Sequence, residues 1–163
     1  FSVQAMAGGT PDHNTICGNV VGSLYVALLR STCRVMTSDQ KVWIPRKRGV
    51  VYPDVTVVCG RVTLMPDTID VVTNPTLIVE VLSPGTEGFD RDEKFEGYRS
   101  IPSLHHYVMV SSQRVLVEHF ARVEDGGWLL RAHEVGASVT MVGPDLTLRV
   151  DDLYRLAFEP DAT

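Results

Sequence analysis

The sequence contains no run of the 18 or so consecutive apolar residues that a membrane-spanning helix needs. Its N-terminus also lacks the order of basic, apolar and small residues that marks a signal peptide. We therefore expect a cytoplasmic protein of bacterial type that has no membrane partner. Internal repeats, low-complexity tracts, a P-loop and a G-x-S-x-G elbow are also missing, which argues against repeat proteins, nucleotide-binding P-loop proteins and serine hydrolases.

Cysteine is scarce, and the spacing of the cysteines matches no known disulfide or metal-binding motif. The three cysteines are Cys17, Cys33 and Cys59, an odd number without any C-x-x-C spacing. Neither a disulfide framework nor a zinc cluster is predicted from such spacing. We expect all three to be reduced, mostly buried small hydrophobic residues.

Positive charge is also in short supply. The formal net charge is −5 at pH 7, which argues against a protein that holds nucleic acid by bulk electrostatic attraction. One local cluster stands out, Arg46-Lys47-Arg48. It has two interpretations, a contact for substrate phosphates or simply a solvated turn.

What the sequence does have is enough apolar material for a full core. Its 163 residues are 44% hydrophobic, which suits one domain over residues 1–163. Within this domain the most informative stretch runs from Asn74 to Pro84, because it places Glu80 inside an otherwise apolar strand. Alternation puts Glu80 on the same strand face as Ile78 and Leu82. A desolvated carboxylate needs an Arg, a Lys or a metal ion as partner, so a structural ion pair is one explanation of Glu80.

A second apolar segment, Gly49 to Cys59, also carries a single acid, Asp54. We expect one strand here, with Pro53 at its entrance or at a bulge. If this strand neighbours the strand of Glu80, the two carboxylates can share one divalent ion, and the Val81 carbonyl is available as a further ligand. Oxygen ligands of this kind favour Mg²⁺ or Mn²⁺.

The combined pattern resembles the Uma2 family (DUF820), which looks like a branch of the PD-(D/E)XK nuclease superfamily. The resemblance runs from about Gln4 to Phe158 and rests on three parts: Tyr-Pro-Asp-Val-Thr-Val-Val from Tyr52, Leu-Ile-Val-Glu-Val-Leu-Ser-Pro-Gly-Thr from Leu77, and Asp90, Lys94 and Tyr98. It implies a metal-dependent endonuclease acting on DNA, with Asp54 and Glu80 as catalytic metal ligands. It also makes a homodimer plausible.

One departure from the superfamily pattern concerns its lysine, which follows the glutamate by two residues and would fall at Leu82. By resemblance, Lys94 on the following helix takes over this catalytic role. The resemblance also places His13 beside the metal site, whereas its spacing alone fits equally a histidine that caps or packs the end of a helix. Gln40, like the Arg46–Arg48 cluster, is a candidate substrate contact or an ordinary surface residue.

The expected fold is α/β (α+β in the strict sense), a restriction-endonuclease-like core in which helices flank a central mixed sheet. Thr10-Pro11-Asp12 is a good helix start, and the apolar stripe predicts a helix to about Leu29. A second helix is predicted over Phe89 to Arg99. The remaining predictions are a strand near Phe1–Ala7, two strands between Thr32 and Ile44, a connection between Gly60 and Pro75, strands at 106–110, 115–120 and 128–132, and a short strand and turn in the tail.

A different class of function stays open beside the nuclease. A catalytically inactive domain of this fold, binding nucleic acid or a protein partner, would account for Leu82 and for the acidic balance. The two possibilities differ in whether the protein binds Mg²⁺ or Mn²⁺ and cleaves DNA.

Overall fold

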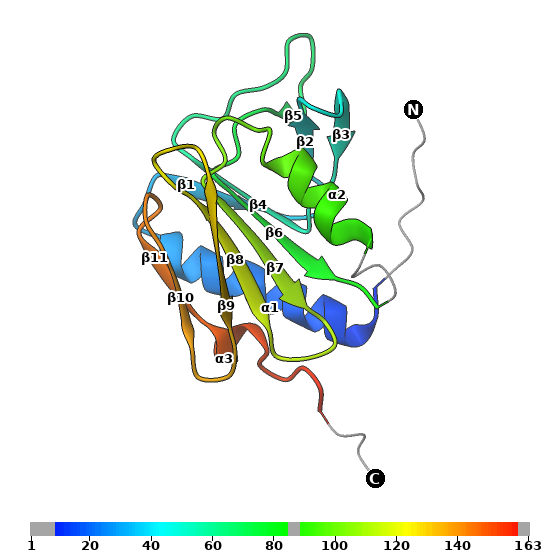
Figure 1. Cartoon of the computed structure of the whole chain (residues 1–163), viewed down its shortest axis with the longest axis vertical. Helices are drawn as coiled ribbons and strands as arrows, with labels where there is room; N and C mark the ends of the chain where they lie inside the picture. Colours follow the sequence, from blue (N-terminus) through cyan, green and yellow to red (C-terminus); the bar gives the residue numbers. More distant parts are fainter. Residues whose placement is uncertain (1–8, 85–88, 160–163) are drawn as a thin grey trace.

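The computed structural model describes residues 9–84 and 89–159, and its centre is a six-stranded mixed sheet (Figure 1). Strands β6 and β7 are parallel, whereas the other neighbouring pairs are antiparallel. In spatial order the strands are β1 (Cys33–Met36), β4 (Val55–Cys59), β6 (Leu77–Leu82), β7 (His106–Ser111), β8 (Val117–Arg122) and β9 (Trp128–His133). The three strands predicted between residues 106 and 132 are confirmed, with their ends shifted by one or two residues.

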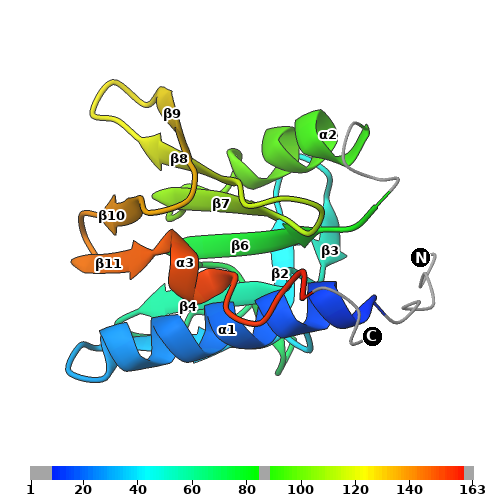
Figure 2. The same ribbon diagram turned by 90° about the horizontal axis from the view of Figure 1, so that it is seen from below.

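Two helices cover opposite faces of this sheet. Figure 2 shows α1 (Pro11–Leu28) along one face and α2 (Phe89–Tyr98) on the other. Both helices and the central mixed sheet agree with the fold class expected from the sequence. Among the described residues, no helix is long and apolar enough to cross a membrane.

Helix α1 begins where the sequence predicts. Thr10 is the N-cap, and its hydroxyl accepts a hydrogen bond from the backbone N–H of His13 at 3.2 Å. The buried face of α1 consists of Ile16, Val20, Leu24 and Leu28, and the partly buried Cys17 packs at its margin. The cap therefore comes from Thr10, which leaves the His13 ring available for another contact.

Strand β6 separates two hydrophobic cores because its side chains alternate between the faces. The core on the α1 side takes Leu77, Val79 and Val81, and the core on the α2 side takes Ile78 and Leu82. All six residues of β6 are buried, as expected for a central strand covered on both faces. Glu80 points to the α2 side, between Ile78 and Leu82.

Two smaller sheets complete the fold and correct several sequence predictions. The segment Gly49 to Cys59 is not one strand: β3 (Gly49–Val51) pairs with β2 (Lys41–Ile44) in a separate three-stranded sheet, and β4 starts only at Val55. Pro53 interrupts the ladder between them because it has no N–H to donate. The predicted connection before Pro75 contains β5 (Val71–Val72), which pairs with β2, and Asp70 forms an ion pair with Lys41.

The C-terminal part is richer in structure than predicted. It contains β10 (Ser138–Met141), which pairs with β11 (Leu146–Arg149), and the short helix α3 (Val150–Leu153). These elements bury Val139, Met141 and Leu148 in the core on the α1 side. The strand predicted at Phe1–Ala7 lies outside the described residues.

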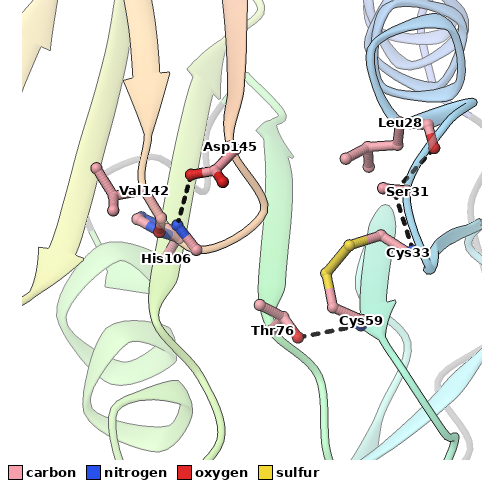
Figure 3. Close-up of a disulfide and its surroundings, with 9 residues drawn as sticks. Leu28, Ser31, Cys33, Cys59, Thr76, His106, Val142 and Asp145 are labelled. Atoms are coloured by element: carbon pink, nitrogen blue, oxygen red, sulfur yellow. Dashed lines mark hydrogen bonds between the residues drawn. A yellow bond between two sulfur atoms is a disulfide. The ribbon is translucent and has the colours of Figure 1, made fainter.

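A disulfide joins Cys33 to Cys59, so the prediction that all cysteines are reduced was wrong (Figure 3). The two residues are 26 positions apart, but antiparallel pairing of β1 with β4 sets them directly opposite each other. Close sequence spacing could not reveal this pair, because its proximity depends on strand register. Cys17 remains a free thiol.

A buried pair of histidines, His106 and His119, lies on β7 and β8. His106 Nδ1 lies 2.9 Å from His119 Nε2, and His106 Nε2 lies 2.7 Å from the Val142 carbonyl. Both histidines are 5% exposed. Burial is the main reason that the pKa of both is lowered, to about 4 for His119.

Candidate active site

The site is built around Glu80, a carboxylate that is only 5% exposed. Helix α2 supplies two of its contacts. The Tyr98 hydroxyl donates a hydrogen bond to Glu80 Oε1, and Lys94 Nζ lies 3.6 Å from Glu80 Oε2. Lys94 and Tyr98 are four residues apart in the helix, so they project together toward the same strand residue.

Asp54 directly precedes β4 and lies beside the end of β6, where β6 has no pairing partner on the β4 side. Pairing between these strands ends at Val55 and Val79, so Val81 has no strand partner on this side. The backbone N–H of Val81 instead donates to Asp54 Oδ2 at 2.8 Å. A side chain thus replaces a missing ladder bond, which fixes the Asp54 carboxylate beside the end of β6.

His13 reaches the same place from α1. Its Nε2 lies 3.0 Å from the Val81 carbonyl oxygen and 3.9 Å from Asp54 Oδ2. Both backbone groups of Val81 on this edge are therefore engaged by side chains, one by Asp54 and one by His13. His13 thus lies beside Asp54 at the start of α1, whose N-cap is Thr10.

The electrostatic environment of Glu80 is unfavourable for its negative charge. Burial, with the nearby Asp54 carboxylate adding to it, raises the pKa of Glu80 to about 7, although Lys94 and the Tyr98 hydrogen bond act in the opposite direction. The pKa of Tyr98 is raised well above its usual value by burial and by the charge of Glu80, so its hydroxyl stays protonated and can donate. Lys94 thus favours the charged form of Glu80, while burial and the Asp54 charge disfavour it.

Comparison with known proteins places this arrangement in a family. The family model of Uma2, described as "Putative restriction endonuclease", matches residues 2–151. The chain belongs to the Uma2 family. Two uncharacterized proteins of Synechocystis sp. are similar to it: one is 35% identical over 125 residues (77% of this chain, 71% of the relative), the other 33% identical over 157 residues (96% and 82%).

The fold of this Uma2 chain also occurs among solved structures. A "putative nuclease belonging to DUF820" from Anabaena variabilis superposes with a TM-score of 0.71 at 14% sequence identity, over 92% of this chain and 83% of that one. At this identity the likeness concerns the fold. It agrees with the restriction-endonuclease-like core expected from the sequence.

The donor set of the Uma2 chain fits a hard divalent cation. Two carboxylates and the Val81 carbonyl offer oxygen atoms at one end of β6, where burial and the Asp54 charge disfavour the charged form of Glu80 and a bound cation would favour it. Mg²⁺ and Mn²⁺ prefer such oxygen ligands. Asp54, Glu80 and Val81 are thus the residues that would hold the ion.

Leu82 lies where the superfamily pattern has its lysine, and it is 4% exposed in the core on the α2 side. An ammonium group there would be buried among Ile78, Tyr98 and Met109. Lys94 instead approaches Glu80 from α2 with its side chain 37% exposed, so its charge remains partly solvated. The helix therefore supplies a cation that the strand position could hold only at a large desolvation penalty.

The predicted substrate contacts divide into two groups. Arg46 Nη2 lies 2.5 Å from Glu96 Oε1, and Lys47 Nζ lies 3.1 Å from Glu93 Oε1, so both cations contact α2, the helix that carries Lys94. Arg48 is exposed and has a positive φ of 47°. Gln40 is directed elsewhere: its amide donates to the backbone carbonyls of Lys41 and Asp70.

Two residues near the site were missed as site residues by sequence reasoning. Tyr98 is part of the motif that carries the family resemblance, and its spacing of four from Lys94 is the signal for a shared contact with Glu80. Cys17 follows His13 by four residues on α1, and its Sγ lies 3.7 Å from His13 Nδ1. Burial, with added effects of the Asp54 and Glu80 charges, raises the pKa of the Cys17 thiol to about 12.

Proposed function

We propose that this Uma2 protein is a metal-dependent endonuclease that hydrolyses phosphodiester bonds of DNA. The observation that carries the proposal is the meeting of Asp54, Glu80 and Lys94 at the end of β6, with Asp54 and Glu80 supplied by different strand segments and Lys94 by a helix. Membership in a family described as "Putative restriction endonuclease" supports the same reaction class.

In this proposal Asp54, Glu80 and the Val81 carbonyl hold Mg²⁺ or Mn²⁺. Such an ion polarises a phosphoryl oxygen and lowers the pKa of a bound water. The protein keeps the ligands in place: the Val81 N–H orients the Asp54 carboxylate, and the Tyr98 hydroxyl orients that of Glu80. His13 contacts the Val81 carbonyl from α1 and so helps to keep the backbone of Val81 in place.

Lys94 has the role of stabilising negative charge that develops on the phosphate during attack. Its ammonium group lies beside Glu80 yet remains partly exposed, so it can also contact a substrate phosphate. Arg46, Lys47 and Arg48 are proposed to contact the DNA backbone next to α2. They provide a local positive surface on a chain whose net charge is −5.

A second function is favoured by one specific observation, the buried Leu82 in place of the superfamily lysine. A nuclease-fold domain that binds nucleic acid or a protein partner without cleaving would need no catalytic lysine. Lys94 separates the two functions, because only the nuclease requires its ammonium group.

The test is cleavage of supercoiled plasmid and of single-stranded DNA in the presence of Mg²⁺ or Mn²⁺. We expect Lys94→Gln to lower the rate by about 100-fold, since removal of one group that stabilises developing charge typically has this effect. Lys41→Gln is the matched control, because Lys41 also pairs with an acid but lies on β2 with Asp70. DNA binding without cleavage by the wild type would support the non-catalytic function instead. Cleavage at equal rates by both variants would overturn the role of Lys94.

A further inference from the structure

A nitrogen, a sulfur and an oxygen ligand converge on the α1 side of the site. The ring nitrogens of His13 lie 3.7 and 4.0 Å from Cys17 Sγ, and His13 Nε2 lies 3.9 Å from Asp54 Oδ2. One ligand atom from each residue lies within 4.8 Å of the other two. We propose that His13, Cys17 and Asp54 form a site for Zn²⁺, with a nitrogen and a sulfur ligand that the all-oxygen site of Asp54, Glu80 and Val81 lacks.

The spacing of these atoms suits a tetrahedral ion. Zn²⁺ binds sulfur at about 2.3 Å, nitrogen at about 2.0–2.1 Å and carboxylate oxygen at about 2.0–2.2 Å, so its ligand atoms stand roughly 3.3–3.6 Å apart. With His13 Nε2 as the nitrogen ligand, its distances to Cys17 Sγ and Asp54 Oδ2 are 4.0 and 3.9 Å, and rotation of the three side chains would bring the ligand atoms to the spacing that a bound ion needs. Three protein ligands and an open position for water are a common zinc arrangement.

Local structure brings two of the ligands together before any ion arrives. His13 and Cys17 are four residues apart on α1, so they share one face of the helix. Asp54 is held on the opposite side by the Val81 N–H. The three side chains are intermediate in burial, so the site is sheltered yet open to exchange with solvent.

The ligand types select the ion. Mg²⁺ takes oxygen ligands and gains little from a thiolate or an imidazole, whereas Zn²⁺ is bound well by both. Binding releases the Cys17 thiol proton to solvent, and no electron transfer is involved. Asp54 belongs to both sets of ligands, so Zn²⁺ and Mg²⁺ compete, and Zn²⁺ holds the site in an inactive state. This last consequence rests on the proposed nuclease function.

Cobalt titration tests the site without any need for nuclease activity. Cys17 is the one cysteine of the chain outside the disulfide, so a thiolate-to-cobalt charge-transfer band reports on Cys17 alone. We expect Co²⁺, added without reductant under anaerobic conditions, to produce this band up to one equivalent and Zn²⁺ to abolish it. Mg²⁺ alone should produce no band.

Variants make the assignment specific. Cys17→Ser should remove the charge-transfer band and weaken Co²⁺ binding by about tenfold or more, while circular dichroism and the melting temperature without metal verify that the variant folds. His119→Gln is the control, because it removes an imidazole from the buried His106–His119 pair and should leave the band unchanged. Cobalt binding without a thiolate band in the wild type, or an unchanged band in Cys17→Ser, overturns the proposal.

A second measurement separates this proposal from the nuclease function. If the protein cleaves DNA with Mg²⁺, added Zn²⁺ should inhibit it, and Cys17→Ser should need at least about tenfold more Zn²⁺ for the same inhibition. Equal inhibition of both proteins overturns the competition. If no cleavage occurs, the nuclease proposal fails while the cobalt band still decides whether the zinc site exists.

Discussion

The hydroxyl of Tyr98 donates a hydrogen bond to Glu80 Oε1 in the buried contact between α2 and β6. This bond ties the orientation of a metal-ligand candidate to a helix that also carries Lys94. The geometry of the site therefore depends on how α2 is seated on the sheet.

Replacing Tyr98 with Phe removes this hydroxyl and little else. We expect the free energy of unfolding at pH 8 to fall by about 1–3 kcal/mol, because a buried carboxylate loses a donor. The hydrogen bond lowers the pKa of Glu80, so its loss should raise that pKa further. Urea denaturation measures the change in the free energy of unfolding. Calorimetric titration with Mn²⁺ should show that Tyr98→Phe binds the ion more weakly than the wild type. Tyr25→Phe, at a position that is 61% exposed, is the control.

Glu80→Gln should make the metal-free protein more stable at pH 8. The folded-state pKa of about 7 lies above the reference value of 4.5, so folding favours protonated Glu80. Protonation of Glu80 therefore stabilises the folded protein fully below pH 4.5, and this stabilisation is lost as the pH rises through 7. Glutamine keeps an acceptor for Tyr98 but carries no charge, and we expect a gain of roughly 1–3 kcal/mol.

Mn²⁺ should reverse this order of stability. It stabilises the wild type by mass action, because it binds the folded protein, and it should have much less effect on Glu80→Gln. Thermal melts of both proteins, with and without Mn²⁺, measure both effects. A wild type that shows no metal-dependent increase in melting temperature would contradict the all-oxygen metal site.

The buried His106–His119 pair should destabilise the fold in acid. The folded-state pKa of His119 is about 4, below its reference value of 6.5, since burial and the charges of nearby histidines and Arg131 disfavour the imidazolium. Stability from this group is therefore present above pH 6.5 and is lost as the pH falls toward 4. This dependence is opposite in sign to that of Glu80.

His119→Gln should flatten the acid limb of the stability profile between pH 6.5 and 4. Glutamine keeps a hydrogen-bonding group beside His106 but does not titrate. Denaturant midpoints at several pH values, compared with those of Glu80→Gln, separate the two opposing contributions. An acid limb of unchanged steepness in His119→Gln would show that other groups cause it.

The double variant Cys33→Ser/Cys59→Ser should lower the free energy of unfolding by about 2–4 kcal/mol. The disulfide closes a loop with a sequence separation of 26, so its removal enlarges the unfolded ensemble. Urea denaturation of the variant and of the oxidised wild type measures the difference. Identical midpoints would mean that the β1 and β4 pairing alone holds this edge of the sheet.

Local signals in the sequence predicted much of the fold and the central acid. Thr10-Pro11-Asp12 marked the start of α1 because cap and first-turn preferences act within a few residues. Alternation in β6 predicted which face Glu80 occupies, since that face follows from strand geometry alone. The family resemblance added Lys94, whose position near Glu80 no local pattern specifies.

Features that depend on register could not be predicted in the same way. The contact of Asp54 with the Val81 N–H arises because β4 stops pairing with β6 at Val55. The Cys33–Cys59 disulfide likewise depends on which residues of β1 and β4 face each other. Such contacts follow from the pairing of distant segments. The type of each residue does not indicate which distant residue it will contact.

Besides the pair of Lys94 with Glu80, ion pairs among the described residues join α2 to the rest of the protein: Arg46 with Glu96, Lys47 with Glu93, and Arg91 with Glu118. The pairs of Arg46 and Lys47 involve largely exposed side chains, which dissolved salt screens readily. A DNA phosphate that binds Arg46 or Lys47 must also take the place of a glutamate. Binding of a polyanion at these residues is thus an exchange of one anion for another, and it frees acidic groups on the very helix that presents Lys94.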